Sequence, residues 1–281
     1  MSKVLLTGLA YGESPRWHEG RLWFSNWGTQ EVVAVDLTGK SEVMVRVGTT
    51  LPYSIDWLPD GRLLVVSGPE ALLLRQEPDG SLVTHAELGG IAGGFNEIVV
   101  AACGNTYVNG FDMMPGEEVG PGVIALVTPD GSARQVADGI VFGNGMAITP
   151  DNSTLIVAES YGRRLTAFDI TDDGDLINPR VWAELGDGYP DGICLDADGA
   201  VWYADVPNQR CVRVREGGQV LQTIKLDRGA FACMLGGPDR STLFMLAAEW
   251  RGFEHMFDEA RTGQVLIAEA PAPGIGYPSV S

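Results

Sequence analysis

The chain has 281 residues and carries 37 acidic against 19 basic side chains, giving a formal net charge of -18 and a pI near 4.4. This charge repels nucleic acid and anionic membrane surfaces and attracts cations, so we expect neither nucleic-acid binding nor membrane association. The length would permit two domains, but all-β barrels and propellers of this size are commonly a single domain.

The beginning of the chain and its cysteines both bear on location. The first ten residues hold one lysine and an apolar run too short for a secretory signal, and no later stretch approaches the roughly 18 apolar residues of a membrane span. The cysteines form no C-x-x-C pair, and each lies in an apolar run, which is typical of reduced core thiols. They are Cys103, Cys194, Cys211 and Cys233. We therefore expect a cytoplasmic protein.

Taken in chain order, the sequence repeats one pattern. A short strand is followed by an Asp-Gly or Glu-Gly turn, then by an apolar strand, and then by further strands around a second glycine turn. The clearest copy runs from Pro190 to Asp205 and turns at Asp198-Gly199. The expected strands lie at 14–17, 22–25 and 32–36; 55–57, 63–66 and 71–74; 97–100, 106–109 and 122–127; 146–148, 155–158 and 165–169; 193–195, 201–205 and 211–214; and 232–235, 243–246 and 263–268.

Six such units at a spacing of about 40 to 48 residues, each long enough for four short strands, are typical of a β-propeller. No stretch keeps a helical period over a dozen residues, which argues against alternating strands and helices. We therefore predict an all-β, six-bladed propeller with four-stranded blades in a single domain over residues 1–281. Residues 4–7 have no partner in the first unit, so by analogy with closed propellers we assign them as the outer strand of the last blade.

Four oxygen-bearing side chains occupy equivalent positions near the start of the first strand of a unit. They are Glu13, Asn96, Asn144 and Asp191. The first strand of each blade lines the central channel of a propeller, so we expect these groups to converge at one mouth of the channel. Carboxylate and amide oxygens suit calcium or a similar hard divalent cation.

Two other readings of these residues stay open. An Asn or Asp before glycine, as at Asn144-Gly145 and Asp191-Gly192, is also a common turn residue. Zinc, manganese and magnesium are alternatives to calcium, but the three histidines lie at non-equivalent repeat positions, which disfavours a histidine-rich zinc site.

These motifs resemble the SMP-30/gluconolactonase/regucalcin-like family. The resemblance rests on three segments in the family's order along the chain: Gly12-Glu13-Ser14-Pro15-Arg16-Trp17, Asn144-Gly145-Met146-Ala147 with Pro150-Asp151, and Pro190-Asp191-Gly192 leading to Asp198-Gly199-Ala200-Val201-Trp202. Members are six-bladed propellers with one divalent metal ion. The resemblance implies Glu13, Asn144 and Asp191 as metal ligands, Asn96 as a contact to metal or substrate, and Asp191 also as the proton-transfer residue of lactone hydrolysis.

A carboxylate that holds a metal is a poor base through its bound oxygen, so Asp191 either uses its free oxygen or acts mainly as a ligand. Glu97 follows Asn96 directly and is a reserve base. Neighbouring strand residues face opposite sides of a sheet, which favours Glu97 as a solvated acid or one inside the blade.

Two departures from the family pattern concern the substrate. Members that act on sugar lactones carry an arginine where this chain has Gly94, and the position of a polar glutamate in some members falls near Met113-Met114. Both changes remove groups that would bind hydroxyls, so we expect a more apolar mouth, with space beside Asn96. The expected apolar neighbours are Phe95, Phe111, Met113, Met114, Phe142 and Tyr189, and Arg16 and Arg163 could replace the lost donors.

Two segments depart from the repeat, at 111–122 and 250–257. Loops of such length are often lids, although a plain connection and a decoration of the rim fit equally well. The aspartate-rich stretch 169–175 lacks the terminal glutamate of an EF-hand and is expected to be a hairpin turn.

The leading hypothesis is a divalent-metal-dependent hydrolase that opens a lactone or related cyclic ester, with a small, less polar substrate than gluconolactone. The alternatives are another Lewis-acid reaction on the same metal, such as sugar-acid dehydration or phosphotriester hydrolysis, and a non-enzymatic calcium-binding or protein-interaction propeller. Neither the substrate nor the oligomeric state can be read from the sequence.

Overall fold

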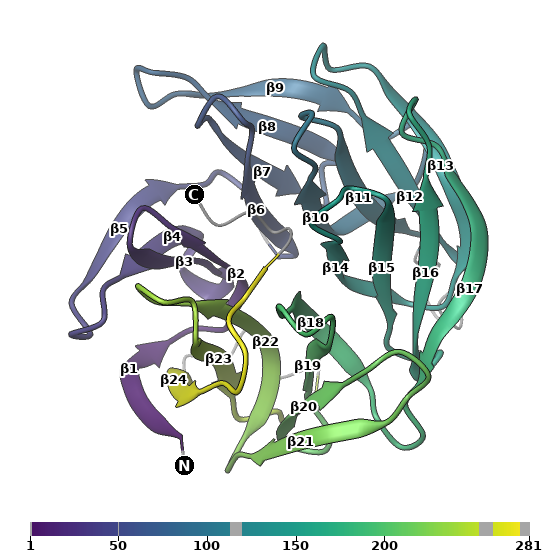
Figure 1. Cartoon of the computed structure of the whole chain (residues 1–281). Coiled ribbons are helices and arrows are strands. Elements are labelled where there is room, and N and C mark those ends of the chain that lie inside the picture. Colours follow the sequence, from purple (N-terminus) through teal and green to yellow (C-terminus); the bar gives the residue numbers. More distant parts are fainter. Residues whose placement is uncertain (1, 50, 113–119, 253–260, 276–281) are drawn as a thin grey trace.

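The computed structural model describes residues 2–49, 51–112, 120–252 and 261–275. Within these ranges the strands form six antiparallel sheets of four strands each, arranged as a ring (Figure 1). The prediction of a six-bladed propeller with four-stranded blades is therefore confirmed. The described helix is a single 3-10 turn at Trp27–Thr29, and these ranges contain no helix with the length and hydrophobicity that a membrane span requires.

Each blade runs from an inner strand at the channel to an outer strand at the rim. The first three blades comprise β2 (Gly12–His18), β3 (Arg21–Asn26), β4 (Glu31–Val35) and β5 (Ser41–Arg46); β6 (Tyr53–Trp57), β7 (Leu63–Ser67), β8 (Leu72–Gln76) and β9 (Leu82–Glu87); and β10 (Gly94–Val100), β11 (Thr106–Phe111), β12 (Gly122–Val127) and β13 (Ala133–Ile140).

The fourth and fifth blades comprise β14 (Gly143–Ile148), β15 (Thr154–Glu159), β16 (Arg164–Ile170) and β17 (Leu176–Glu184); and β18 (Pro190–Leu195), β19 (Val201–Asp205), β20 (Arg210–Val214) and β21 (Val220–Lys225). The sixth comprises β22 (Gly229–Gly236), β23 (Thr242–Ala248), β24 (Gly263–Glu269) and β1 (Lys3–Leu9). Because β1 pairs with β24, the N-terminal strand completes the last blade, as predicted.

Burial follows the position of a strand within its blade. Every residue of the inner strand β22 is buried, whereas the outer strand β5 has one buried residue. A strand covered on both faces reads as a continuous apolar run, and a strand at the rim alternates with polar residues. The strongest apolar runs in the sequence accordingly belong to strands inside the blades, such as β7 and β23, rather than to strands at the rim.

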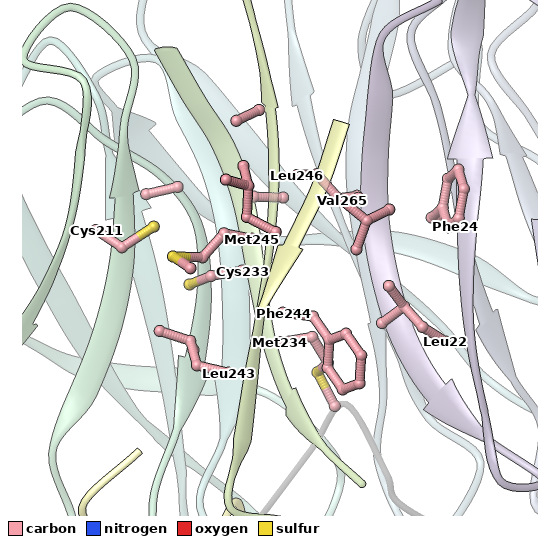
Figure 2. Close-up of a cluster of buried hydrophobic side chains, with 14 of the residues drawn as sticks. Leu22, Phe24, Cys211, Cys233, Met234, Leu243, Phe244, Met245, Leu246 and Val265 are labelled. Atoms are coloured by element: carbon pink, nitrogen blue, oxygen red, sulfur yellow. The ribbon is translucent and has the colours of Figure 1, made fainter. Parts of the chain in front are cut away.

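Neighbouring blades pack through apolar side chains. Figure 2 shows one such cluster, in which Phe244 and Met234 of the sixth blade lie beside Leu22 of the first, while Cys233 points towards Cys211 of the fifth. Trp17 stacks on Phe244 with ring centroids 5.3 Å apart, which joins the first blade to the sixth. The cysteines of the described chain are free thiols.

The segment after β24 crosses one face of the ring towards its centre (Figure 1). The amide of Ile275 donates a hydrogen bond to the carbonyl of Leu195 (3.1 Å), and Gly274 donates to Arg240 (2.9 Å). Leu195 ends β18, whereas Asp191 lies near its beginning. The C-terminal segment therefore covers the face opposite to the predicted site.

Candidate functional site

The predicted site residues lie where the inner strands begin, and there the pairing with the second strand is irregular. The register shifts between Glu13 and Arg16 in β2, between Phe95 and Ile98 in β10, between Gly143 and Met146 in β14, and between Pro190 and Ile193 in β18. Such bulges bend the strand and turn side chains away from strict alternation. The repeat places Glu13, Asn96, Asn144 and Asp191 at these irregularities.

Hydrogen bonds join three blades at this level. Asn96 donates through Nδ2 to Oδ1 of Asn144 (3.2 Å), so these two predicted residues are in direct contact. Asn144 donates to Ser160 Oγ (3.4 Å), which in turn donates to the carbonyl of Pro190 (2.6 Å). The amide of Asn144 is therefore held between the third blade and the residue that precedes Asp191.

The two predicted carboxylates are strongly perturbed. Glu13 is 7% exposed, and its pKa lies well above the usual range because it is buried and because the charges of Asp191 and Glu97 oppose its ionisation. Asp191 is partly exposed at the surface, and burial together with the charges of Glu97 and Asp205 raises its pKa as well. This mutual repulsion would be relieved by a cation.

Glu97 contributes to the same electrostatic environment, because its charge raises the pKa of Glu13 and Asp191. It stands at the register shift in β10 and is buried at 8% exposure, so of the two expected readings the solvated acid is wrong. Its Oε2 lies 3.6 Å from Arg16 Nη2, and its Oε1 is buried without a hydrogen-bond partner. Arg16 does not enter the mouth as a substrate donor, because it is buried at 2% exposure and donates to the carbonyls of Pro15 (2.9 Å) and Ile98 (2.6 Å).

The donor set fits a hard divalent cation. Glu13, Asp191 and Asn144 offer only oxygens towards a metal, which is the chemistry that calcium and magnesium prefer. In the described part of the chain, no group of three or more histidine, cysteine, aspartate and glutamate side chains is arranged to hold a metal. The predicted ligand set has only two carboxylates, and its third ligand is the amide oxygen of Asn144, so it is not a group of three such side chains.

The histidines play other parts. His18 stacks on Trp57 with ring centroids 4.1 Å apart, and His85 contacts Arg75 through Nδ1 at 3.2 Å. His255 lies outside the described residues.

The third blade shapes one side of the mouth, although differently from expectation. Gly94 pairs with Phe111, and a Cβ atom added at Gly94 would lie 3.2 Å from the Phe111 ring. The expected open space beside Asn96 is therefore covered by an aromatic ring. Phe95 is fully buried among apolar residues of the second and third blades, so its assignment to the mouth was wrong. Met113 and Met114, like much of the 250–257 segment, lie outside the described residues.

The fourth and fifth blades add aromatic rings. Phe142 stacks on Tyr161 at 4.5 Å, and burial together with the charge of Asp191 raises the pKa of Tyr161. The guanidinium of Arg163 lies 4.5 Å above the ring of Tyr189 and donates to its hydroxyl. Tyr189 and Arg163 thus form one unit at the rim beside Asp191.

The sequence reasoning missed an aromatic cluster on the sixth and first blades. Phe231 contacts Tyr11 edge-on at 5.5 Å and Trp250 at 5.9 Å. Phe231 lies at the irregularity in β22, the position at which other inner strands carry Glu13 or Asp191. The signal for Phe231 is its place in the repeat, at the position equivalent to Glu13 and Asp191.

Comparison with known proteins identifies relatives of this chain. The model of the SMP-30/Gluconolactonase/LRE-like region matches residues 11–249. The chain belongs to this family.

A regucalcin of Xenopus laevis is 30% identical over 84% of this chain and 83% of its own length. A 6-deoxy-6-sulfogluconolactonase of Pseudomonas putida is 27% identical over 56% of each chain. The crystal structure of a calcium-binding protein, regucalcin, from Agrobacterium tumefaciens superposes with a TM-score of 0.78 at 21% identity, covering 98% of this chain and 95% of that one. The family match contains Glu13, Asn96, Asn144 and Asp191, so the proposed site lies within it.

Proposed function

We propose that this protein is a divalent-metal-dependent lactonase that acts in the cytoplasm on a small lactone less polar than gluconolactone. The observation that carries the proposal is the pair of carboxylates with raised pKa, Glu13 and Asp191, together with the hydrogen-bonded amides of Asn96 and Asn144. Membership of a family with lactonase members supports the reaction class, and the free thiols fit a reducing compartment.

Glu13, Asn144 and Asp191 would hold the ion, and calcium suits their all-oxygen set best. When bound, the ion would supply Lewis acidity for the lactone carbonyl and lower the pKa of a bound water. Asn96 would contact the substrate, because its Nδ2 reaches Asn144 and its backbone carbonyl is held by Ser54 Oγ at 2.7 Å.

Asp191 would move the proton. Water adds to the lactone carbonyl carbon while a carboxylate oxygen of Asp191 takes one of its protons. The ring C–O bond then breaks, and the same proton passes to the leaving alkoxide, so that lactone and water give one hydroxy acid and Asp191 is regenerated.

The rim supports an apolar substrate. The ring of Phe111 covers Gly94, and Phe142, Tyr161 and Tyr189 lie on the side of Asp191. These rings offer contact area to hydrocarbon, and the Arg163 guanidinium beside them is engaged with the ring and hydroxyl of Tyr189, so we expect aliphatic and aromatic lactones to be preferred over sugar lactones.

The proposal is tested by replacing Asp191 and measuring bound metal and lactone turnover together. Asp191→Ala, like Glu13→Ala and Asn144→Ala, should lose the metal and reduce turnover at least about a hundredfold, since each removes an oxygen ligand. Asp173→Ala is the matched control, because Asp173 is an exposed aspartate in the hairpin between β16 and β17. Full metal occupancy in Asp191→Ala would contradict the ligand assignment, and a wild-type protein that opens no lactone with metal present would contradict the activity.

A further inference from the structure

Glu97 is a buried acid that the proposed ligand set and proton transfer do not use. Its main-chain amide donates to Asn109 Oδ1 (3.1 Å), and Asn109 in turn donates through Nδ2 to the carbonyl of Asn144. The backbone of Glu97 is therefore tied to the backbone of a proposed ligand. The side chain cannot drift to solvent, because it is 8% exposed and its Oε2 faces Arg16.

The two oxygens of Glu97 have different surroundings. Oε2 lies 3.6 Å from Arg16 Nη2, which balances part of the carboxylate charge. Oε1 is buried and has no partner in the protein. A buried carboxylate oxygen without a donor is costly, and in native structures such a group indicates a water or an ion at that place.

Glu97 is linked to the proposed ligands by geometry as well as by charge. Its ionic partner Arg16 lies three residues after Glu13 on β2, its neighbour Asn96 contacts Asn144, and its charge raises the pKa of both Glu13 and Asp191. Among the described residues, Glu97 differs from Glu13 and Asp191 in having an arginine within 4 Å of its carboxylate, which favours a place outside the direct ligands. A group in that position acts by orienting the inner shell and by adding negative charge, and the affinity of oxygen-ligand sites for divalent cations rises with charge.

We propose that Glu97 is a positioning residue of the ion site, held by Arg16, whose free Oε1 accepts a hydrogen bond from a water molecule in the site and whose charge strengthens divalent-cation binding. This inference rests on the metal site of the proposed function. Asn96 and Glu97 both stand at the register shift in β10, where strict alternation of side chains does not hold.

The test is calcium binding to the full chain, measured by titration calorimetry with calcium chloride and no lactone present. Glu97→Gln keeps the shape and removes the charge, and should raise the calcium Kd about 10- to 100-fold, the usual effect of losing an outer-shell partner. Glu97→Asp keeps the charge and should recover part of the affinity. If Glu97→Gln does not fold, Glu97→Ser removes the same charge and carries the same expectation.

Asp56→Asn is the matched control. Asp56 is a second buried carboxylate on Arg16, with its Oδ1 3.7 Å from Nε, and its charge does not contribute to the raised pKa values of Glu13 and Asp191. Its calcium Kd should stay close to the wild-type value. A Glu97→Gln protein that binds calcium as tightly as wild type would overturn the inference, and so would equal weakening by Asp56→Asn, because that would assign the effect to Arg16.

Failure of the two proposals can be told apart. If the wild type binds calcium and Glu97→Gln weakens it, but no lactone is opened, the inference stands and the proposed activity fails. If the wild type binds no divalent cation, the ion site and the role of Glu97 fail together.

Discussion

Arg16 is a buried cation that connects three blades. It approaches Asp56 on β6 and Glu97 on β10, and donates to the carbonyl of Ile98. Breaking a buried ion pair by removing one partner is strongly destabilising, because the other charge is left in a poorly solvated place. The arginine of the Ser14-Pro15-Arg16 motif thus organises the floor of the site, whereas the sequence offered it as a possible substrate donor.

Asp56 gives a prediction at the scale of one titrating group. Burial raises the pKa of Asp56 to about 6, with the charge of Arg16 and hydrogen bonds from Val100 and Trp57 opposing the rise. The folded state therefore binds a proton that the unfolded chain releases at its ordinary pKa near 3.8. The stability that this proton contributes is full below about pH 4 and lost as pH rises through 6, a change of up to about 3 kcal/mol.

Urea unfolding between pH 4.5 and 7 measures this effect. The free energy of unfolding of wild type minus that of Asp56→Asn should fall as pH rises, because the variant lacks the titrating carboxyl group at position 56. Asp60→Asn is the control, because Asp60 is exposed and its hydrogen bonds with Arg62 lower its pKa. Parallel pH curves for wild type and Asp56→Asn would show that Asp56 is ionised in the folded protein throughout this range.

At the scale of strands, pairing between β10 and β11 decides what lies over Gly94. Because Gly94 faces Phe111 across the pair, the aromatic ring fills the place where family members that act on sugar lactones carry an arginine side chain. Glycine in place of arginine at position 94 therefore does more than remove a hydrogen-bond donor. It leaves room for the Phe111 ring, which forms an apolar surface beside Asn96, so Gly94 and Phe111 act together.

Gly94→Arg should shift substrate preference towards polar lactones. The added guanidinium offers hydrogen bonds to hydroxyls, worth about 1.5–3 kcal/mol each, which corresponds to at least about a tenfold change in the ratio of kcat/KM values. The ring of Phe111 must move for the side chain to enter, so Gly94→Arg combined with Phe111→Ala should give the larger shift.

The measurement compares kcat/KM for a sugar lactone and an alkyl lactone of equal ring size. Gly90→Arg is the control, since a side chain at Gly90 meets nothing within 4 Å and lies outside the pair of strands. A wild-type preference for the sugar lactone would show that the apolar reading of the mouth is wrong even if the metal site is right.

At the scale of the whole molecule, the proposed ion would join blades that are far apart in sequence. Glu13 lies on the first blade, Asn144 on the fourth and Asp191 on the fifth. Pairing of β1 with β24 closes the ring, and the C-terminal segment bonds through Ile275 and Gly274 to the face opposite the proposed site. On the face that carries the site, a bound cation would stabilise the ring by relieving repulsion among the acids of the channel mouth.

Chelation should therefore destabilise the protein. A ligand that binds only the folded state adds about 2.7 kcal/mol when it is present at a hundred times its Kd. For a chain of this size that corresponds to about 5 °C or more in Tm. Thermal unfolding with chelator, and then with calcium restored, measures the effect. The Asp173→Ala control keeps the proposed ligands, so its Tm should fall with chelator and recover with calcium as in wild type. An unchanged Tm in wild type would favour the reading of Asn144 and Asp191 as turn residues.

The sequence by itself determined the architecture, because a repeated pattern of apolar strands and glycine turns can satisfy its hydrogen bonds and bury its inner strands in few ways. Six units predicted six blades, and the unpaired N-terminal strand predicted the closure by β1. Equivalent positions in the repeat also brought forward Glu13, Asn96, Asn144 and Asp191, of which the structure places Asn96 and Asn144 in contact and the two acids in one electrostatic cluster.

Only the tertiary structure decided the details that depend on register and bulges. Alternation in β10 predicted a solvated acid at Glu97 or one inside the blade, and the structure buries Glu97 beside Arg16 at an irregularity of the strand. Pairing across the hairpin placed Phe111 on Gly94, and packing between the second and third blades buried Phe95 away from the mouth. These outcomes could not be read from the chain because each is set by which residues meet across strands, and a shift of one residue turns a side chain to the other face.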